Sequence, residues 1–221
     1  ARERVSVPVG QLPALVAELR AALPSAPPFW LVGGAVRDLL LGRPLHDFDF
    51  VTAGDGVALA RAAADHLRAA FYPLDAERGV GRVLLTRGDE RLTLDFARMR
   101  GGSLAADLAA RDFTLNALAL DPADPEAVID PTGGQADLRA KLIRQCGPQS
   151  LSDDPVRTIR AVRLAVQLGF RLDPATRAAN RCSPSSSLLW SLRCPGFRIV
   201  SPLRKSPSPK RSSTSHYRCL A

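Results

Sequence analysis

The stretch from Leu31 to Thr52 reads LVGGAVRDLLLGRPLHDFDFVT and decides the fold prediction. It opens in an apolar run that predicts a short strand, and that strand ends at Gly33 and Gly34. A short helical pattern follows as far as Gly42, and a second apolar run then predicts another strand. A strand, a glycine turn, a helix and a second strand together indicate an α/β domain.

The glycine turn and the helix behind it suit the binding of a phosphate group. Because they have no Cβ atom, Gly33 and Gly34 let backbone N–H groups approach an anion closely. The start of the helix adds free N–H groups and a partial positive charge. Arg37 supplies a forked donor for phosphate oxygens. We therefore expect a phosphate site where these features meet.

The second strand carries two carboxylates that suit metal binding. Asp47 and Asp49 are two residues apart, so both side chains leave the same face of the strand. Phe48 and Phe50 alternate with them and are predicted to point into the core. Two parallel carboxylates beside a phosphate site are the arrangement that a pair of Mg²⁺ ions requires. We expect Asp47 and Asp49 to be the metal ligands and the catalytic residues.

These residues follow the pattern GG-x-VRD, and D-x-D comes after it on the next strand. The pattern resembles the nucleotidyltransferase superfamily, and in particular the class II family of bacterial CCA-adding enzymes (tRNA nucleotidyltransferases) and poly(A) polymerases. The matching residues are Gly33, Gly34, Val36, Arg37, Asp38, Asp47 and Asp49. The stretch lacks the third glycine of a dinucleotide fingerprint and the GK[ST] of a Walker A loop, which excludes both. The resemblance implies that Gly33, Gly34, Arg37 and Asp38 contact the nucleotide.

A second segment, RDFTLNALA from Arg111 to Ala119, is similar to the RRDFTxNAxA segment of the same family. Ala110 stands where the family has its first arginine. The resemblance implies that Arg111 meets the phosphates, that Asp112 meets the ribose and that Asn116 orders the local backbone. The alternative is that Arg111 and Asp112 form an ordinary ion pair.

Residues 130–144 resemble the family's DPxGGxxDLxxxxIR segment, which we interpret as architectural. Gly133 and Gly134 are predicted to form a turn, and Asp137 is predicted to cap a helix. Earlier in the chain, Asp95 ends a predicted strand that could lie beside the strand of Asp47 and Asp49. Asp95 is therefore either a third acidic group, which would bind metal or deprotonate the attacking hydroxyl, or a surface residue of a hairpin.

A third segment, residues 153–163, resembles the family's EDPxRxxRAxRF segment. Asp153 replaces the glutamate, and Leu164 replaces the phenylalanine. The resemblance implies that Asp154 and Arg157 act as a protein template for the incoming base. It also implies that Arg160 and Arg163 support the triphosphate or the base.

The template has a sensible chemistry, because a carboxylate accepts from the exocyclic amine of C or A and an arginine donates to the neighbouring ring atom. CTP and ATP would fit, whereas GTP and UTP present the wrong polarity. The alternative is a solvated row of charges on a helix. The apolar residues of this helix are predicted to pack on the preceding domain; they are Val156, Ile159, Val162 and Val166.

Hydrophobic periodicity predicts the remaining elements. We expect helices over residues 10–23, 55–70, 104–120 (interrupted near 111–114) and 153–168, with Gly169 ending the last. We expect strands over residues 80–86 and 91–96, joined by a hairpin turn, and short strands over 127–130 and 142–144.

Charge is distributed unevenly along the 221 residues, whose formal net charge is +8. Residues 174–221 hold nine Lys or Arg residues and no Asp or Glu, so the first 173 residues have a net charge of −1. From about Arg177 the chain is rich in Ser, Pro and basic residues and has no sustained period, which predicts a disordered tail. Either a change of reading frame near residues 178–182 or a natural basic tail would explain this change.

We therefore expect a nucleotidyltransferase head with a mixed sheet over residues 1–145, the start of an all-α neck over 146–176 and a basic tail over 177–221. The four cysteines and three histidines show no metal-binding spacing, and no apolar run reaches the length of a membrane span. The sequence indicates a cytoplasmic protein.

The resemblance implies transfer of C or A from CTP or ATP to the 3′ end of tRNA, with Mg²⁺ as cofactor. Full CCA addition, CC addition, A addition and poly(A) addition all remain open at this point. Two alternatives of other classes also remain, namely a nucleotide-binding remnant without activity and an RNA-binding protein that acts through its basic tail.

Overall fold

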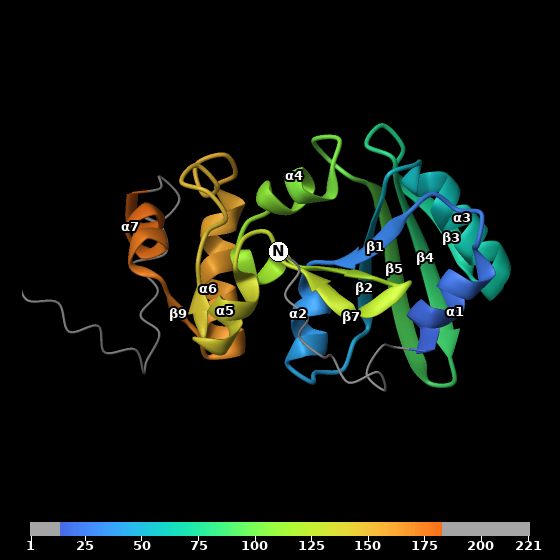
Figure 1. The fold of residues 1–221 in the computed structure, drawn as a ribbon, viewed down its shortest axis with the longest axis horizontal. Helices are drawn as coiled ribbons and strands as arrows, with labels where there is room; N and C mark the ends of the chain where they lie inside the picture. The colour runs from blue at the N-terminus through green and yellow to red at the C-terminus, as the bar shows by residue number, and fades with distance from the viewer. Residues whose placement is uncertain (1–13, 183–221) are drawn as a thin grey trace, which may run out of the picture.

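The computed structural model describes residues 14–182 of the 221, and its centre is a seven-stranded mixed sheet (Figure 1). The strand order is β3-β4-β5-β2-β1-β6-β7. The pair β2–β5 is parallel, and every other pair in this sheet is antiparallel. The strands are β1 (Phe29–Val32), β2 (Asp47–Thr52), β3 (Ala70–Asp75), β4 (Val80–Arg87), β5 (Glu90–Arg98), β6 (Ala119–Asp121) and β7 (Asp124–Ile129). The expected mixed sheet with flanking helices is confirmed.

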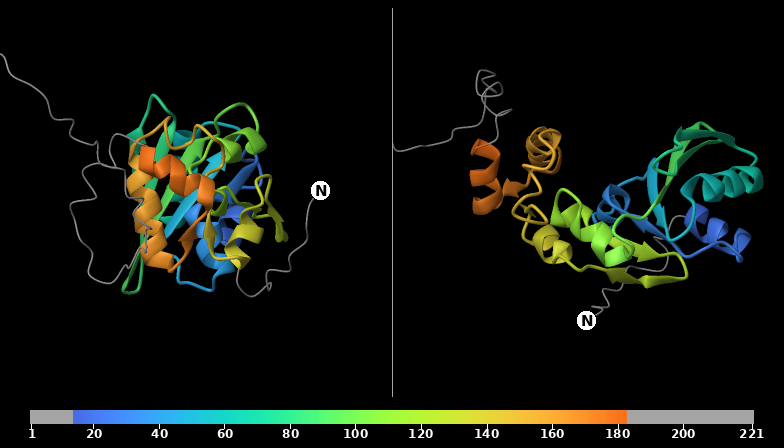
Figure 2. Two further views of the ribbon diagram at one scale, coloured as in Figure 1. Left: turned by 90° about the vertical axis from the view of Figure 1, so that its left-hand side faces the viewer. Right: turned by 90° about the horizontal axis from the view of Figure 1, so that it is seen from above.

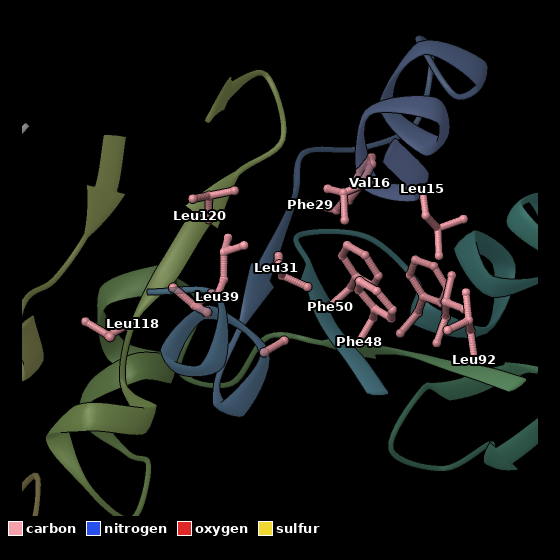
Figure 3. Close-up of a cluster of buried hydrophobic side chains, with 14 of the residues drawn as sticks. Leu15, Val16, Phe29, Leu31, Leu39, Phe48, Phe50, Leu92, Leu118 and Leu120 are labelled. Atoms are coloured by element: carbon pink, nitrogen blue, oxygen red, sulfur yellow. The ribbon is translucent and has the colours of Figure 1, made fainter. Parts of the chain in front are cut away.

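Two helices cover one face of the sheet and create the main core. They are α1 (Ala14–Ala22) and α3 (Gly56–Leu67), and both lie on the same side of the molecule in Figures 1 and 2. Phe48 and Phe50 point into this core, as their alternation with the two aspartates predicts. Figure 3 shows them near Phe29 and the α1 residues Leu15 and Val16. The opposite face of β2 is left for its carboxylates.

The hairpin and the glycine turn form as expected. The strands β4 and β5 pair along their whole length and meet at a two-residue turn, Gly88–Asp89. Helix α2 (Gly34–Leu40) follows β1 directly, and Gly42 after it has a φ of 65°, a conformation that glycine adopts without strain.

The expectation of a helix over residues 104–120 is wrong beyond its first part. Helix α4 (Leu104–Ala109) is followed by a short 3-10 turn, η2 (Thr114–Asn116), and then by β6. Leu31 pairs with Leu120 and Val32 with Ala119, so the sheet recruits residues that have good helix propensity. Tertiary pairing therefore overrides local preference here.

The prediction that Asp137 caps a helix is also wrong. Helix α5 (Gly134–Arg139) begins after Gly133, and the carboxylate of Asp130 accepts the backbone N–H groups of Gly134 and Gln135. Asp137 lies inside the helix and accepts the Thr114 hydroxyl at 2.7 Å. It therefore fastens α5 to η2, next to the predicted nucleotide-binding segment.

The last part of the described chain is mainly helical. Strands β8 (Leu142–Ile143) and β9 (Arg171–Leu172) form a small parallel pair, and α6 (Val156–Leu168) and α7 (Pro174–Cys182) lie at the opposite end of the molecule from α1 and α3 (Figures 1 and 2). Gly169 ends α6 in a left-handed conformation, as expected. Because α7 continues to Cys182, the expected disorder from residue 177 is wrong for residues 177–182. The rest of the predicted tail, 183–221, lies outside the described residues.

The prediction that the valine and isoleucine face of α6 packs on the head is wrong. Val156, Ile159, Val162 and Val166 are between 43% and 74% exposed. The buried residues of α6 are Thr158, Ala161 and Leu164. On this other face Ala161 and Leu164 pack in the hydrophobic core. Arg157 and Arg160 find hydrogen-bond acceptors on the head beside them.

Candidate active site

Eleven of the thirteen predicted site residues line one cleft with a volume of about 440 Å³. The cleft lies between the sheet and α6, where β1 ends and β2 begins. The predicted residues that line it are Gly33, Gly34, Arg37, Asp38, Asp47, Asp49, Arg111, Asp112, Asn116, Arg160 and Arg163. Segments that are far apart in the sequence thus meet at one place.

The carboxylates of Asp47 and Asp49 both face the cleft, because β2 buries the residues that alternate with them. Phe50 stacks on Phe96 of β5 with ring centroids 4.8 Å apart, which anchors β2 below the carboxylates. The prediction that both aspartate side chains leave the same face of the strand is confirmed.

The pKa of Asp49 is raised above its ordinary value. The largest cause is desolvation of the carboxylate by the surrounding protein atoms, although the side chain still meets solvent in the cleft. The like charges of Asp95 and Asp47 raise the pKa further. Arg111 and Arg160 oppose the shift. A bound cation stabilises carboxylates that repel one another in this way, because its positive charge offsets their like charges.

Gly33 lies close to two charged side chains of the cleft, the guanidinium of Arg111 and the carboxylate of Asp49. Gly33 has a φ of 75°, and a Cβ atom placed on it would lie 3.1 Å from Nη1 of Arg111 and 3.6 Å from Oδ2 of Asp49. A side chain there would therefore be strained and would intrude between these two charges. The first glycine is needed both for the turn and for the open space of the cleft.

Arg37 lines the cleft, but its guanidinium is already engaged. It donates to both carboxylate oxygens of Asp38, at 3.0 and 2.7 Å, and to Oδ1 of Asn116 at 2.6 Å. The residue is only 6% exposed. Arg37 therefore joins the first predicted segment to the second, in addition to any contact with phosphate.

Asp112 continues this network to α6. Its carboxylate accepts the backbone N–H of Phe113, the amide of Asn116 and the Nε–H of Arg160 at 2.8 to 3.1 Å. Asp112 is 7% exposed. The chain of contacts from Arg37 through Asn116 and Asp112 to Arg160 holds α6 against the head, so the cleft has a hydrogen-bonded floor.

The last two predicted site residues, Asp154 and Arg157, do not line this cleft. Arg157 donates to the backbone carbonyls of Ala110, Arg111 and Ser150 at 3.2 to 3.4 Å. Asp154 accepts the backbone N–H of Val156 and lies 3.8 Å from the Arg157 guanidinium. Both therefore sit at the start of α6, directly behind the segment that carries Arg111.

Sequence reasoning missed several residues of the cleft. His46, Leu164 and Gln167 line it without having been predicted. Their signals were weak: His46 precedes the aspartate pair, and Gln167 lies seven residues after Arg160 on the same helix face.

Asp107 of α4 is a further missed residue, and it controls Arg111. Its carboxylate is 1% exposed, accepts from Nε and Nη2 of Arg111 at 3.2 and 2.9 Å, and also accepts from the backbone and side chain of Arg100. These cations and hydrogen bonds lower the pKa of Asp107 against the opposing effect of its burial. The spacing of four residues to Arg111 was the available signal.

If Arg111 binds the triphosphate, as the family resemblance implies, replacing Asp107 by Asn should loosen Arg111 and weaken that binding. The amide retains the shape but provides only one acceptor oxygen and no charge. We expect about a tenfold loss of affinity for CTP, corresponding to one charge-assisted contact, and little change for cytidine, which has no phosphate. Titration with the two ligands measures the difference, and an equal loss for both would mean that the variant disturbs the whole cleft.

The described residues contain no gathering of three or more His, Cys, Asp or Glu side chains suited to a metal ion. Asp47 and Asp49 provide oxygen ligands only, which suits Mg²⁺, an ion that is usually held by one or two carboxylates together with substrate phosphates. The residues present therefore fit Mg²⁺ when a nucleotide supplies the remaining ligands.

A mixed sheet whose parallel pair carries two carboxylates beside a glycine turn and a set of arginines defines a nucleotidyltransferase head. The family model that describes the poly(A) polymerase head domain matches residues 29–144. The chain belongs to this family, as the resemblance in its sequence implied.

Known tRNA nucleotidyltransferases are similar to this chain over about two thirds or more of its length. The CC-adding tRNA nucleotidyltransferase of Geobacter sulfurreducens is 47% identical over 149 residues, which cover 67% of this chain and 34% of that protein. The A-adding tRNA nucleotidyltransferase of Deinococcus radiodurans is 42% identical over 163 residues, which cover 73% and 36%. This chain thus spans about a third of the length of these relatives.

Solved structures agree with the fold. The complex structure of a CCA-adding enzyme with CTP has a TM-score of 0.72 at 30% identity, covering 84% of this chain and 47% of that one. A tRNA nucleotidyltransferase complexed with a primer tRNA and an incoming ATP analog has a TM-score of 0.67 at 34% identity. In the part of this chain that the structure describes, no helix is long and apolar enough to cross a membrane.

Proposed function

We propose that this chain transfers C or A from CTP or ATP to the 3′-hydroxyl of a tRNA and releases pyrophosphate. The observation that carries the proposal is the cleft in which Asp47 and Asp49 face Arg111 and Arg160. The named functions of the related proteins favour tRNA over other RNA acceptors. Full CCA addition, CC addition and A addition share these head residues, so the proposal covers all three.

Asp47 and Asp49 would hold Mg²⁺, which when bound supplies charge neutralisation at the phosphates and increases the acidity of the attacking hydroxyl. Arg111, held by Asp107, would bind the triphosphate, and Arg160 and Arg163 of α6, which line the same cleft, would support the triphosphate or the base. Asp95 pairs in register with Asp49 from the neighbouring strand β5 and is a further acidic group next to the pair.

We further propose a head to about residue 145 and, from residue 146, the start of a neck that contains α6; the presence of α7 extends this neck beyond the expected residue 176. The chain is proposed to act in the cytoplasm. An incorporation assay tests the main proposal: labelled CTP and ATP are incubated with Mg²⁺ and a tRNA that lacks its CCA end. A second preparation, in which the chain is extended to the full length of a relative, shows whether the described residues act alone. No incorporation by either preparation would contradict the proposal.

Asp154 and Arg157 do not line the cleft but lie at the start of α6, behind the segment that carries Arg111, and from there they are proposed to choose the base. The variant Asp154→Ala tests this. Losing the acceptor for the exocyclic amine should relax discrimination against UTP by about 1–3 kcal/mol. The rates with all four nucleotides measure the effect, and Asp153→Ala, which changes an exposed neighbour, is the matched control. Because Asp154 also accepts the N–H of Val156, an equal loss for every nucleotide would indicate a helix cap instead.

A further inference from the structure

A row of side chains crosses the open face of the sheet and ends at the carboxylate pair. Tyr72 of β3 pairs in register with Arg82 of β4. Arg82 pairs in turn with Asp95 of β5, and Asp95 pairs with Asp49 of β2. Residues opposite each other on neighbouring strands project from the same face. The row therefore connects the outer strand of the sheet with the cleft.

Arg82 holds both oxygens of Asp95. Its Nε and Nη2 donate to Oδ1 and Oδ2 of Asp95, each at 2.6 Å, in a two-pronged ion pair. The two side chains are 31% and 22% exposed. The strand β4 lies on the opposite side of β5 from β2. The contact therefore commits the Asp95 carboxylate to a partner on the side away from Asp49.

The surroundings of Asp49 agree with this arrangement. Asp95 still raises the pKa of Asp49 through its charge, so the two groups are close enough to interact. Nevertheless, Asp47, Asp49 and Asp95 do not gather into a three-residue metal site within residues 14–182. The hydrogen bond with Asp95 is also the main reason why the pKa of Arg82 is raised, and Tyr72 adds to that effect.

We propose that Arg82 is a positioning residue that withholds Asp95 from the metal pair, so that the free cleft offers a divalent cation two carboxylates instead of three. The inference rests on the proposed function, because it takes Asp47 and Asp49 as the metal ligands. A site with two carboxylates holds a bare cation weakly and gains its other oxygens from a triphosphate. Arg82 thereby favours a cation that arrives together with a nucleotide.

The binding of Mn²⁺ without nucleotide or RNA tests this role, since free Mn²⁺ is counted by electron paramagnetic resonance. Arg82→Met should bind Mn²⁺ about five- to tenfold more tightly at neutral pH, because a nearby positive charge is lost and Asp95 is released. Arg82→Lys keeps the charge but cannot hold both oxygens, so we expect a smaller gain. If the methionine variant folds poorly, the lysine variant still gives the comparison.

Two controls define the effect. Arg87→Met removes the same charge from the same strand, where Arg87 pairs with Glu18 of α1, and should leave Mn²⁺ affinity unchanged. Combining Arg82→Met with Asp95→Asn should abolish the gain, because the third carboxylate is then absent. A merely structural role of Arg82 would lower stability without tightening Mn²⁺ binding.

The outcomes separate this inference from the proposed function. If Asp49→Asn leaves Mn²⁺ binding unaltered, the metal site itself is misplaced and both proposals fail. If Asp49→Asn weakens binding while Arg82→Met leaves it unchanged or weaker, the proposed function stands and only the role of Arg82 is overturned.

Discussion

Replacing Asp49 by Asn is expected to reduce nucleotide transfer by roughly 10³-fold, since it removes several kcal/mol of charge stabilisation that a bound metal would supply. Asp47→Asn should have a similar effect. The amide keeps the shape of the side chain, so the fold should persist. Asp89→Asn, in the exposed turn between β4 and β5, is the matched control for a lost acidic charge. Initial rates with saturating CTP measure the loss.

The same variant should be more stable than the parent protein when no metal is present. Because the pKa of Asp49 is raised in the folded state, folding is opposed by the ionised carboxylate at neutral pH. This penalty disappears as the pH falls below the ordinary range of an aspartate, about 4, where the group is protonated in both states. Melting temperatures of both proteins at pH 7 and near pH 3 should therefore differ only at pH 7. Retained transfer by Asp49→Asn would refute its assignment as a metal ligand.

Replacing Gly134 by Ala is expected to destabilise the protein by about 3 kcal/mol or more, at the upper end for an overpacked site. A Cβ atom at this position would lie 2.1 Å from the carbonyl oxygen of Thr114 and 2.7 Å from its carbonyl carbon. Both are backbone atoms of η2, which cannot move without displacing Asn116 from Arg37. Denaturant unfolding gives the change in free energy.

Gly133→Ala is the natural comparison for this variant. Gly133 has a φ of 81°, but a Cβ atom there would meet nothing within 4 Å, so only the cost of a left-handed conformation applies, about 1–2 kcal/mol. Equal losses for the two variants would mean that close approach to Thr114 does not limit this turn.

The chemical centre could be predicted from the sequence because each of its signals is local. Gly33, Asp47 and Asp49 lie within one short stretch, and the alternation with Phe48 and Phe50 fixes which side chains reach the cleft. The position of Arg111 beside them needed the family resemblance, since nothing in the sequence states that the segment between α4 and η2 lies next to β2.

The missed features depend on long-range contacts. Strand β3 contains Pro73 and is mostly exposed, which is tolerated at a sheet edge but gives no alternating pattern. Residues 117–120 are fully buried, and Ala119 and Leu120 pair with β1, although alanine and leucine favour a helix. The exposed apolar residues of α6 could not be foreseen, because their helix is attached through Arg157 and Arg160. The position of Asp95 between Arg82 and Asp49 follows from the strand register, which the sequence alone does not show.

The way in which α6 is attached has a consequence for how such a protein diversifies. The carboxylate pair is fixed by the backbone pairing of β2 with β1 and β5, whereas α6 meets the head through side chains such as Arg160 on Asp112. If α6 takes part in nucleotide choice as proposed, substitutions on it could change which nucleotide is accepted while the backbone pairing that fixes the carboxylate pair stays intact. Relatives named for CC addition and for A addition are both similar to this chain over about two thirds or more of its length.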